Sequence, residues 1–236
     1  MINPPSKSFS GDDCSLVLAI STIDESMTLR RPHCGFLYLS ESEGAEFLLH
    51  LAFHNKLLKD SWLNKDYHWA YLKNVSVETQ ENLVDWLEII HSADLTKTSP
   101  IPYSAHYSGD ESFDDDGLYI NQNNGTGLTC ATFILAATAK FGLKIVDATT
   151  WPKNGESFTW FRWIFWMLRE YGGDVEASEL HKQFLHRRSL KRLHPLEVVV
   201  AGHCYDGKVL TYDEVQNFVR SSGVKIGMSR WRGRIL

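Results

Sequence analysis

The chain has 236 residues, of which 43% are hydrophobic and 22% charged, and its formal net charge at pH 7 is −5. These fractions are ordinary for a soluble globular protein and exclude a mainly disordered chain, which would have few aromatic residues and a large net charge. The acidic balance argues against binding to nucleic acid mainly through charge, and four cysteines are too few for a disulfide scaffold of this length.

The first part of the chain has the pattern of an antiparallel sheet that follows a loose polar arm at 1–13. Residues 15–22 have the composition of a strand. Two apolar runs, 31–40 and 46–60, are separated by a polar turn and predict a hairpin. The run 66–77 is rich in aromatic and β-branched residues and predicts a further strand.

Helices and loops follow this sheet. Apolar residues at helical spacing predict a helix over 78–94, and a long polar loop with an acidic cluster at 110–116 comes next. A second helix is predicted from Cys130 to a C-cap at Gly142, with a strand over 144–151 after it.

The last third of the chain is predicted to be mainly helical. Residues 158–173 indicate an aromatic-rich helix, and 178–195 a basic amphipathic helix. The apolar run 196–207 is interpreted as a strand and turn. A helix over 211–222 begins with the residues of a capping box. The mixture of strands and helices predicts an α+β fold.

Nothing at the N-terminus resembles a signal peptide, because no basic segment followed by an apolar stretch is present. No apolar run approaches the roughly 18–20 residues needed to span a bilayer. The cysteines at 14, 34, 130 and 204 contain no C-x-x-C pair. These features predict a cytoplasmic protein with free thiols, or one secreted by a route that needs no signal peptide.

Cys130 has the sequence context of a nucleophile. It follows a Gly- and Asn-rich approach, NQNNGTGLT, and opens an apolar helix. The N-terminus of a helix presents unpaired backbone N–H groups and a partial positive charge, which lower the pKa of a thiol and favour the thiolate. The same N–H groups can stabilise the oxyanion of a tetrahedral intermediate. The alternative role of such a cysteine is that of a small buried residue.

A nucleophilic thiol needs a base within hydrogen-bonding distance, and the base needs a partner that orients it. His33 and His50 lie in the two apolar runs of the predicted hairpin, 17 positions apart. Antiparallel pairing can place both side chains on the same face of the sheet. For either histidine alone, a hydrogen-bonded structural role is the alternative.

Three short segments resemble the motifs of one superfamily. Residues 33–39, HCGFLYL, are similar to the H-x-G-I-Y-x-G strand of the NlpC/P60 superfamily, and 47–52, FLLHLA, to the V-I-H-x-A segment that follows it. Residues 128–133, LTCATF, resemble the N-C-x-x-F start of the helix that bears the nucleophile. The order His, His, Cys is similar to that of the circularly permuted branch, which includes lecithin:retinol acyltransferase-like proteins and bacterial papain-like hydrolases.

The resemblance implies a permuted papain-like fold, in which a small antiparallel sheet packs on the helix of the nucleophile. Position by position, it implies Cys130 as nucleophile, His33 as general base and His50 as the residue that orients the base. It covers about residues 30–145, and Thr129 stands where the family has Asn. His54, four positions after His50, is an alternative third member.

The conventional order, with the base after the nucleophile, is a further alternative. His194 and His203 follow Cys130 by 64 and 73 positions, and His203 lies in an apolar run. The acidic residues at 110–116 lack the ligand spacing of a calcium loop. No metal or cofactor is predicted.

These observations predict an arm at 1–13, a permuted papain-like catalytic core at 14–150 and a helical extension at 151–236 packed on the core. The expected activity is that of a peptidase or amidase that cleaves cell-wall peptide or protein through an acyl-enzyme on Cys130, with a secreted effector as one setting. The alternatives are a lipid acyltransferase or phospholipase of the same fold, and an inactive interaction protein. The expected partners are a peptide or acyl-bearing substrate and an acidic surface or polymer at the basic helix 181–193, without nucleic acid or a transmembrane segment.

Overall fold

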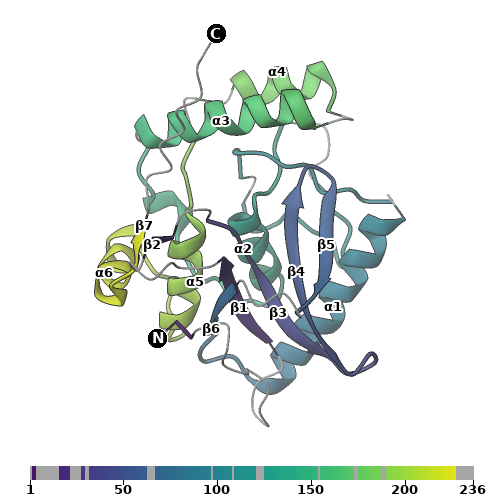
Figure 1. The fold of residues 1–236 in the computed structure, drawn as a ribbon, viewed down its shortest axis with the longest axis vertical. Coiled ribbons are helices and arrows are strands. Elements are labelled where there is room, and N and C mark those ends of the chain that lie inside the picture. Colours follow the sequence, from purple (N-terminus) through teal and green to yellow (C-terminus); the bar gives the residue numbers. More distant parts are fainter. Residues whose placement is uncertain are drawn as a thin grey trace.

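The protein is an α+β chain built on one antiparallel sheet. A computed structural model describes residues 2–3, 16–21, 28–29, 32–62, 67–96, 98–107, 109–120, 125–153, 155–172, 175–185, 187 and 190–226. These residues form a five-stranded sheet, a short two-stranded pair and six α-helices (Figure 1). The predicted α+β class is therefore confirmed.

The strands of the main sheet lie in the order β5-β4-β3-β1-β6, and every neighbouring pair runs antiparallel. Their bounds are β1 (Leu16–Ser21), β3 (Cys34–Ser40), β4 (Ala45–Phe53), β5 (Lys56–Ser61) and β6 (Tyr67–Tyr71). The second, parallel pair consists of β2 (Thr28–Leu29) and β7 (Lys225–Ile226). The predicted first strand and the hairpin of β3 and β4 are confirmed, and β6 occupies the first part of the predicted further strand.

The run 46–60, predicted as one strand, forms the two strands β4 and β5. The run 46–60 breaks at His54 and Asn55, where the chain turns back along itself, and Asn55 has a φ of 51°. Asn tolerates this left-handed conformation better than most residues, so a polar pair in an apolar run becomes a turn. The register of β5 on β4 places Asp60 opposite Leu48, two residues from His50. This second hairpin therefore brings a carboxylate beside His50.

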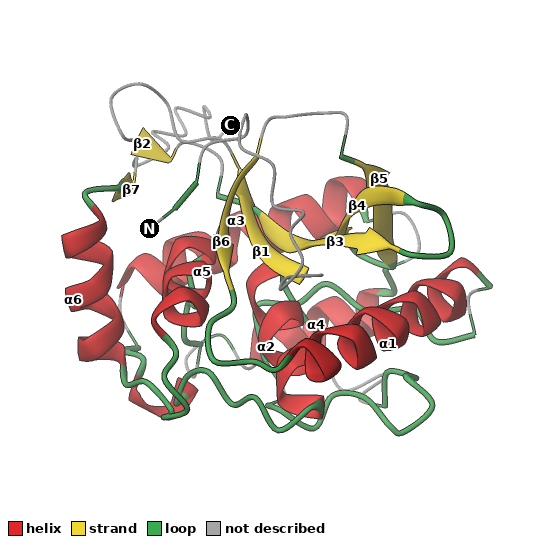
Figure 2. Cartoon of the chain, turned by 90° about the horizontal axis from the view of Figure 1, so that it is seen from below, coloured by secondary structure: helices red, strands yellow, loops and turns green. Residues whose placement is uncertain are grey.

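Three helices cover one face of the sheet, as Figure 2 shows: α1 packs on β5 and β1, α2 on β3 and β4, and α5 on β1 and β6. Helix α6 lies beside α5, and α3 and α4 lie together across one end of the molecule (Figure 1). The helices are α1 (Val77–Leu95), α2 (Cys130–Lys140), α3 (Gly155–Tyr171), α4 (Ala177–Leu185), α5 (Pro195–Cys204) and α6 (Tyr212–Ser222). The helices predicted in the α1, α2, α3 and α6 regions are confirmed, and Gly142 adopts the left-handed φ of 73° expected after a helix end.

The core lies between the sheet and these helices. In β1, Leu18 and Ile20 face the helical layer and join its apolar cluster, which includes residues of α2 and α5. The alternate residues Val17 and Ala19 face the other side, where they pack with Trp69 in a smaller cluster. The alternation follows from the twofold period of a strand, and it makes β1 buried on both faces.

The prediction of a strand over 196–207 is wrong, because most of this run lies in helix α5. Pro195 occupies the first helical turn, and His194 and Glu197 form a capping box before it. The helix is buried on almost every side, so its apolar residues show no helical period that could be recognised in the sequence. Its Gly202 lies so close to β1 that a Cβ atom would be 2.4 Å from Leu18 Cδ1.

Three other predictions differ from the structure. The strand predicted over 144–151 is a single bridge from Val146 to Leu210, followed by a short 3₁₀ helix, Ala148–Thr150. The basic helix predicted over 178–195 ends at Leu185, and Lys191 instead donates to the carbonyls of residues 148 and 149. Asn3 in the predicted loose arm pairs with β6, whereas the rest of the arm lies outside the described residues. None of the helices in the described ranges has the length and hydrophobicity needed to cross a bilayer.

Candidate active site

Cys130 is the first residue of α2, and the N-terminus of that helix is capped. Thr129 is the N-cap: its hydroxyl accepts the backbone N–H of Thr132 at 3.2 Å, while its own N–H donates to the Thr132 hydroxyl at 2.7 Å. Thr129 thus performs a capping role for which Asn is also suited, so the helix start does not require Asn at this position. Cys130 is 4% exposed.

The structure brings both predicted histidines to Cys130. His33 lies directly before β3 and His50 lies inside β4, and His33 Nε2 is 2.6 Å from His50 Nδ1. The His33 side chain also faces Cys130, whose charge and hydrogen bond raise the pKa of His33. Cys130, His33 and His50 therefore form a continuous chain of contacts from the helix to the sheet.

Gly35 permits the close approach of the two histidine strands. A Cβ atom at this position would lie 2.6 Å from the Leu49 carbonyl oxygen and 2.8 Å from the Cβ atom of His50. Any side chain would push β4 away and displace His50 from His33. Gly35, the glycine of the H-x-G pattern, is thus required because β3 and β4 leave no space for a side chain at this position.

A fourth side chain continues the chain of contacts. Asp60 Oδ2, on β5, is 2.9 Å from His50 Nε2. The His50 side chain is 9% exposed and the Asp60 side chain 54%, so the contacts run from the interior to the surface. Asp60 was not among the site residues predicted from the sequence, because the turn between β4 and β5 was not predicted. Asn55 within the apolar run is the signal that could have revealed this turn.

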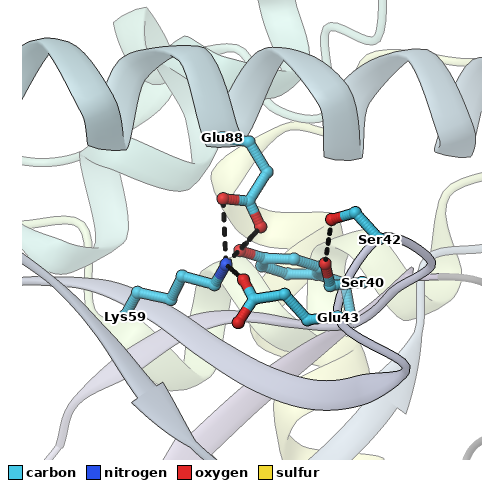
Figure 3. A network of polar contacts seen from close by, with 6 residues as sticks. Ser40, Ser42, Glu43, Lys59 and Glu88 are labelled. Carbon is cyan, nitrogen blue, oxygen red and sulfur yellow. Dashed lines mark hydrogen bonds and ion pairs between the residues drawn. The ribbon is translucent and has the colours of Figure 1, made fainter.

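An ion-pair network holds β5 in place beside this aspartate (Figure 3). Lys59, the neighbour of Asp60, contacts Glu43 in the β3–β4 turn and lies 2.8 Å from Glu88 of α1. Tyr38 of β3 donates to the same Glu88 carboxylate at 2.6 Å. Because the Lys59 side chain is only 10% exposed, its charge is shielded from solvent, and the network ties β5 to α1 and to the neighbouring hairpin.

The surroundings of Cys130 favour its thiolate. The hydrogen bond from the Cys34 thiol is the largest influence and lowers the pKa of Cys130, while burial acts in the opposite direction. The charge and hydrogen bond of His33 and the backbone N–H of Cys34 lower it further, and the net result is a pKa well below the ordinary value of a thiol. Cys130 is therefore expected to be a thiolate at neutral pH, paired with a charged His33.

The pKa values of His33 and His50 are shifted in opposite directions. Burial acts to lower the pKa of His33, but the charge and hydrogen bond of Cys130 and the charge of Asp60 outweigh it and raise that pKa. Burial lowers the pKa of His50, and the charge of His33 adds to this against the opposing effect of Asp60. A neutral His50 donates from Nε2 to Asp60 and accepts at Nδ1 from His33 Nε2, which leaves His33 Nδ1 for Cys130.

Replacement of Asp60 by Asn is expected to reduce kcat about 10- to 100-fold with little change in KM, because Asp60 positions His50 and does not touch substrate. The Asp60 charge raises the pKa of His33, so its loss lowers that pKa. The alkaline limb of the pH–rate profile should then move to lower pH. Asp85→Asn, an exposed aspartate on α1, is the matched control and should leave both the rate and the profile unchanged. A slower Asp60→Asn enzyme with an unshifted profile would contradict this role.

Tyr103 also reaches the nucleophile and was not predicted from the sequence. Its hydroxyl accepts the backbone N–H of Cys130 and donates to the Cys130 sulfur, and burial together with the thiolate charge raises the pKa of Tyr103 well above its usual value. The hydroxyl therefore keeps its proton. Tyr103 stands in an irregular loop whose position depends on tertiary contacts, so no sequence pattern marks it.

The alternative histidines lie elsewhere. His54 Nδ1 accepts the backbone N–H of Tyr103 at 3.2 Å, so it supports the loop that carries the tyrosine. His194 caps α5 through Nδ1, and burial, with the charge of Arg192, lowers its pKa to about 3. His203, on α5, hydrogen-bonds to the backbone of Tyr71 on edge strand β6. The contacts of these three histidines are thus with other parts of the chain, whereas His50 contacts His33.

Carboxylates of the acidic loop at 110–116 bind other groups of the protein. Asp110 lies 3.0 Å from Lys144, and the Asp114 carboxylate accepts the backbone N–H groups of Asp116 and Leu118. Over the part of the chain that the structure describes, no three His, Cys, Asp or Glu side chains are grouped so as to hold a metal ion.

Comparisons of this chain with protein-family models, with curated proteins and with solved structures found no match.

Proposed function

We propose that this protein is a thiol hydrolase that cleaves amide bonds through an acyl-enzyme on Cys130. The observation that carries the proposal is the linked set Cys130, His33, His50 and Asp60, in which the pKa of the thiol at a helix N-terminus is lowered and that of His33 is raised. A structural cysteine would be expected to be neutral, whereas a nucleophile needs both the lowered pKa and an oriented base.

The proposed reaction uses the ion pair of Cys130 and His33. The thiolate attacks the carbonyl carbon, and the resulting oxyanion is stabilised by a hydrogen bond from the hydroxyl of Tyr103, which lies against both the backbone and the side chain of Cys130. His33 then gives its proton to the leaving amine, and the C–N bond breaks to leave a thioester. Water, deprotonated by His33, attacks the thioester and releases the acid and Cys130.

The finer fold we propose is the permuted papain-like arrangement. It is supported by the order of the elements, since the two histidine strands β3 and β4 precede the helix of the nucleophile, and by the packing of α2 on those strands. The resemblance of residues 33–39, 47–52 and 128–133 to the motifs of the permuted NlpC/P60 branch agrees with the same arrangement.

The proposed substrate is cell-wall peptide or protein, and the motif resemblance supports this choice. An acidic surface or polymer is proposed as a further partner for the basic segment 181–193. Its support is a neighbouring surface in which Phe158 and Phe184 are 44% and 42% exposed, beside exposed Arg162, and in which Arg187 stacks on Phe184 at 3.9 Å. Aromatic and guanidinium groups together are typical of surfaces that bind anionic polymers.

The test is hydrolysis of two defined substrates, purified peptidoglycan and an isopeptide-linked protein conjugate, followed by the appearance of new amino groups. The wild-type chain is expected to release amines from one of them, and Cys130→Ala to release none above background, a loss of at least about 10³-fold. Cys204→Ala, which removes a half-buried thiol on α5, should keep full activity.

Other outcomes separate the alternatives. Release of fatty acid from phospholipid vesicles in place of amines would establish the lipid acyltransferase or phospholipase reading. Turnover of no substrate, together with a Cys130 alkylation rate at acidic pH equal to that of an ordinary exposed thiol, would make the chain an inactive interaction protein.

A further inference from the structure

Cys34 is a buried thiol that the proposed hydrolysis does not use. It is the first residue of β3, directly after His33, and it is 0% exposed. It faces the helical layer, as does Phe36 two residues later, and Phe36 packs at 5.9 Å on Phe133, one turn after Cys130 on α2. The thiol and the backbone N–H of Cys34 both act to lower the pKa of Cys130. Acyl transfer requires one thiol, so the second thiol in contact with it points to another reaction.

The pKa values of the two thiols are shifted in opposite directions. Burial, followed by the hydrogen bond and charge of Cys130, raises the pKa of Cys34 well above its ordinary value, so Cys34 keeps its proton while Cys130 is a thiolate. A thiolate is the form that attacks a peroxide, and an adjacent thiol converts the resulting sulfenic acid into a disulfide. Hydrogen peroxide is small enough to reach Cys130, which is 4% exposed.

We propose that Cys130 and Cys34 form an oxidation site for hydrogen peroxide, in which Cys130 reacts first and Cys34 closes a disulfide. The Cys130 sulfur attacks one peroxide oxygen, the O–O bond breaks, and His33 protonates the departing hydroxide to water. The Cys34 sulfur then attacks the sulfenic sulfur of Cys130 and expels hydroxide, which takes the Cys34 proton and leaves as water. Two thiols are oxidised to one disulfide, and one peroxide is reduced to two waters.

The disulfide would remove the nucleophile from the site until a thiol reductant restores it. Without Cys34, the sulfenic acid would remain open to further oxidation to the sulfinic and sulfonic acids, which thiol reductants do not reverse.

The test is mass spectrometry of the full chain after treatment with hydrogen peroxide and digestion without reductant. We expect the peptides of Cys34 and Cys130 to be joined through the loss of two hydrogen atoms, in the wild type and equally in Cys204→Ser. In Cys34→Ser, Cys130 should instead gain oxygen atoms. Oxygen atoms on wild-type Cys130 without a joined pair, or a pair that contains Cys14 or Cys204, would overturn the proposal.

This result does not depend on the hydrolase proposal, because the joined peptides are read in the wild-type chain without any substrate. For the same reason, the result does not depend on whether a variant folds. Where hydrolysis is observed, oxidised wild type should recover full activity with dithiothreitol, and oxidised Cys34→Ser should recover little. An active enzyme whose peroxide inhibition is irreversible in the wild type would count against the disulfide and leave the hydrolase intact.

Discussion

Replacement of His33 by Ala is expected to slow the alkylation of Cys130 by iodoacetamide by up to about 10²-fold near pH 6, the limit reached if the thiol regains its ordinary pKa. The thiolate is the reacting species, and a thiol with an ordinary pKa near 8.5 is under about 1% ionised at that pH. In the wild type, the pKa of Cys130 is held well below this value, first by the Cys34 hydrogen bond and then by the charge and hydrogen bond of His33. The lowered pKa means that the thiolate is present at neutral pH and is lost only as the pH falls through it.

The pH profile shows which of these contributions is removed. The alkylation rate should change less with pH in wild-type Cys130 than in His33→Ala, where it should rise more steeply between about pH 6 and 8. Each rate is measured by quantifying the alkylated peptide by mass spectrometry, with the Cys204 peptide as an internal reference in the same digest. His181→Ala, an exposed histidine on α4, is the matched control. A wild-type profile in His33→Ala would exclude His33 as the partner of the thiolate.

Local sequence signals identified the three residues that meet at the site. Cys130 follows a glycine-rich approach to an apolar helix, and His33 and His50 lie in apolar strands separated by one turn. Each of these features depends on neighbours within a few residues, which is why it can be recognised in one sequence. Whether these residues catalyse a reaction stays a prediction.

The other members of the set could not be recognised in this way. Asp60 reaches His50 only through the register of β5 on β4, which depends on a turn at Asn55. Tyr103 and Cys34 contact Cys130 through tertiary packing of a loop and a strand on α2. A single sequence contains no periodic signal for such contacts, because they join segments that are far apart along the chain.

The same distinction applies to the fold. Helix α6 was predicted because its capping residues and its exposed face are local features. Helix α5 was mistaken for a strand because its valines favour strands and its burial on nearly all sides erased the helical period. The chain became a helix there because Pro195 and the His194 cap fix its first turn and because the sheet and neighbouring helices bury it.

Replacement of Phe133 by Ala is expected to lower the free energy of unfolding by about 3–5 kcal/mol, a large part of the roughly 5–15 kcal/mol available to a typical domain. Phe133 is 0% exposed and lies one turn after Cys130 on α2. Its ring packs edge-to-face against Phe36 of β3 at 5.9 Å and against Phe113 of the acidic loop at 6.4 Å. Truncation therefore leaves a cavity where helix, sheet and loop meet.

Urea unfolding followed by circular dichroism measures this loss, and Phe158→Ala is the matched control. Phe158 is 44% exposed on α3, so the same truncation should cost under about 0.5 kcal/mol. Since Phe133 supports the first turn of α2, the variant should also lose the fast alkylation of Cys130 under conditions where it is still folded. A cost below about 1 kcal/mol for Phe133→Ala would mean that α2 is not packed on β3 as described, and the contact of Cys130 with His33 depends on that packing.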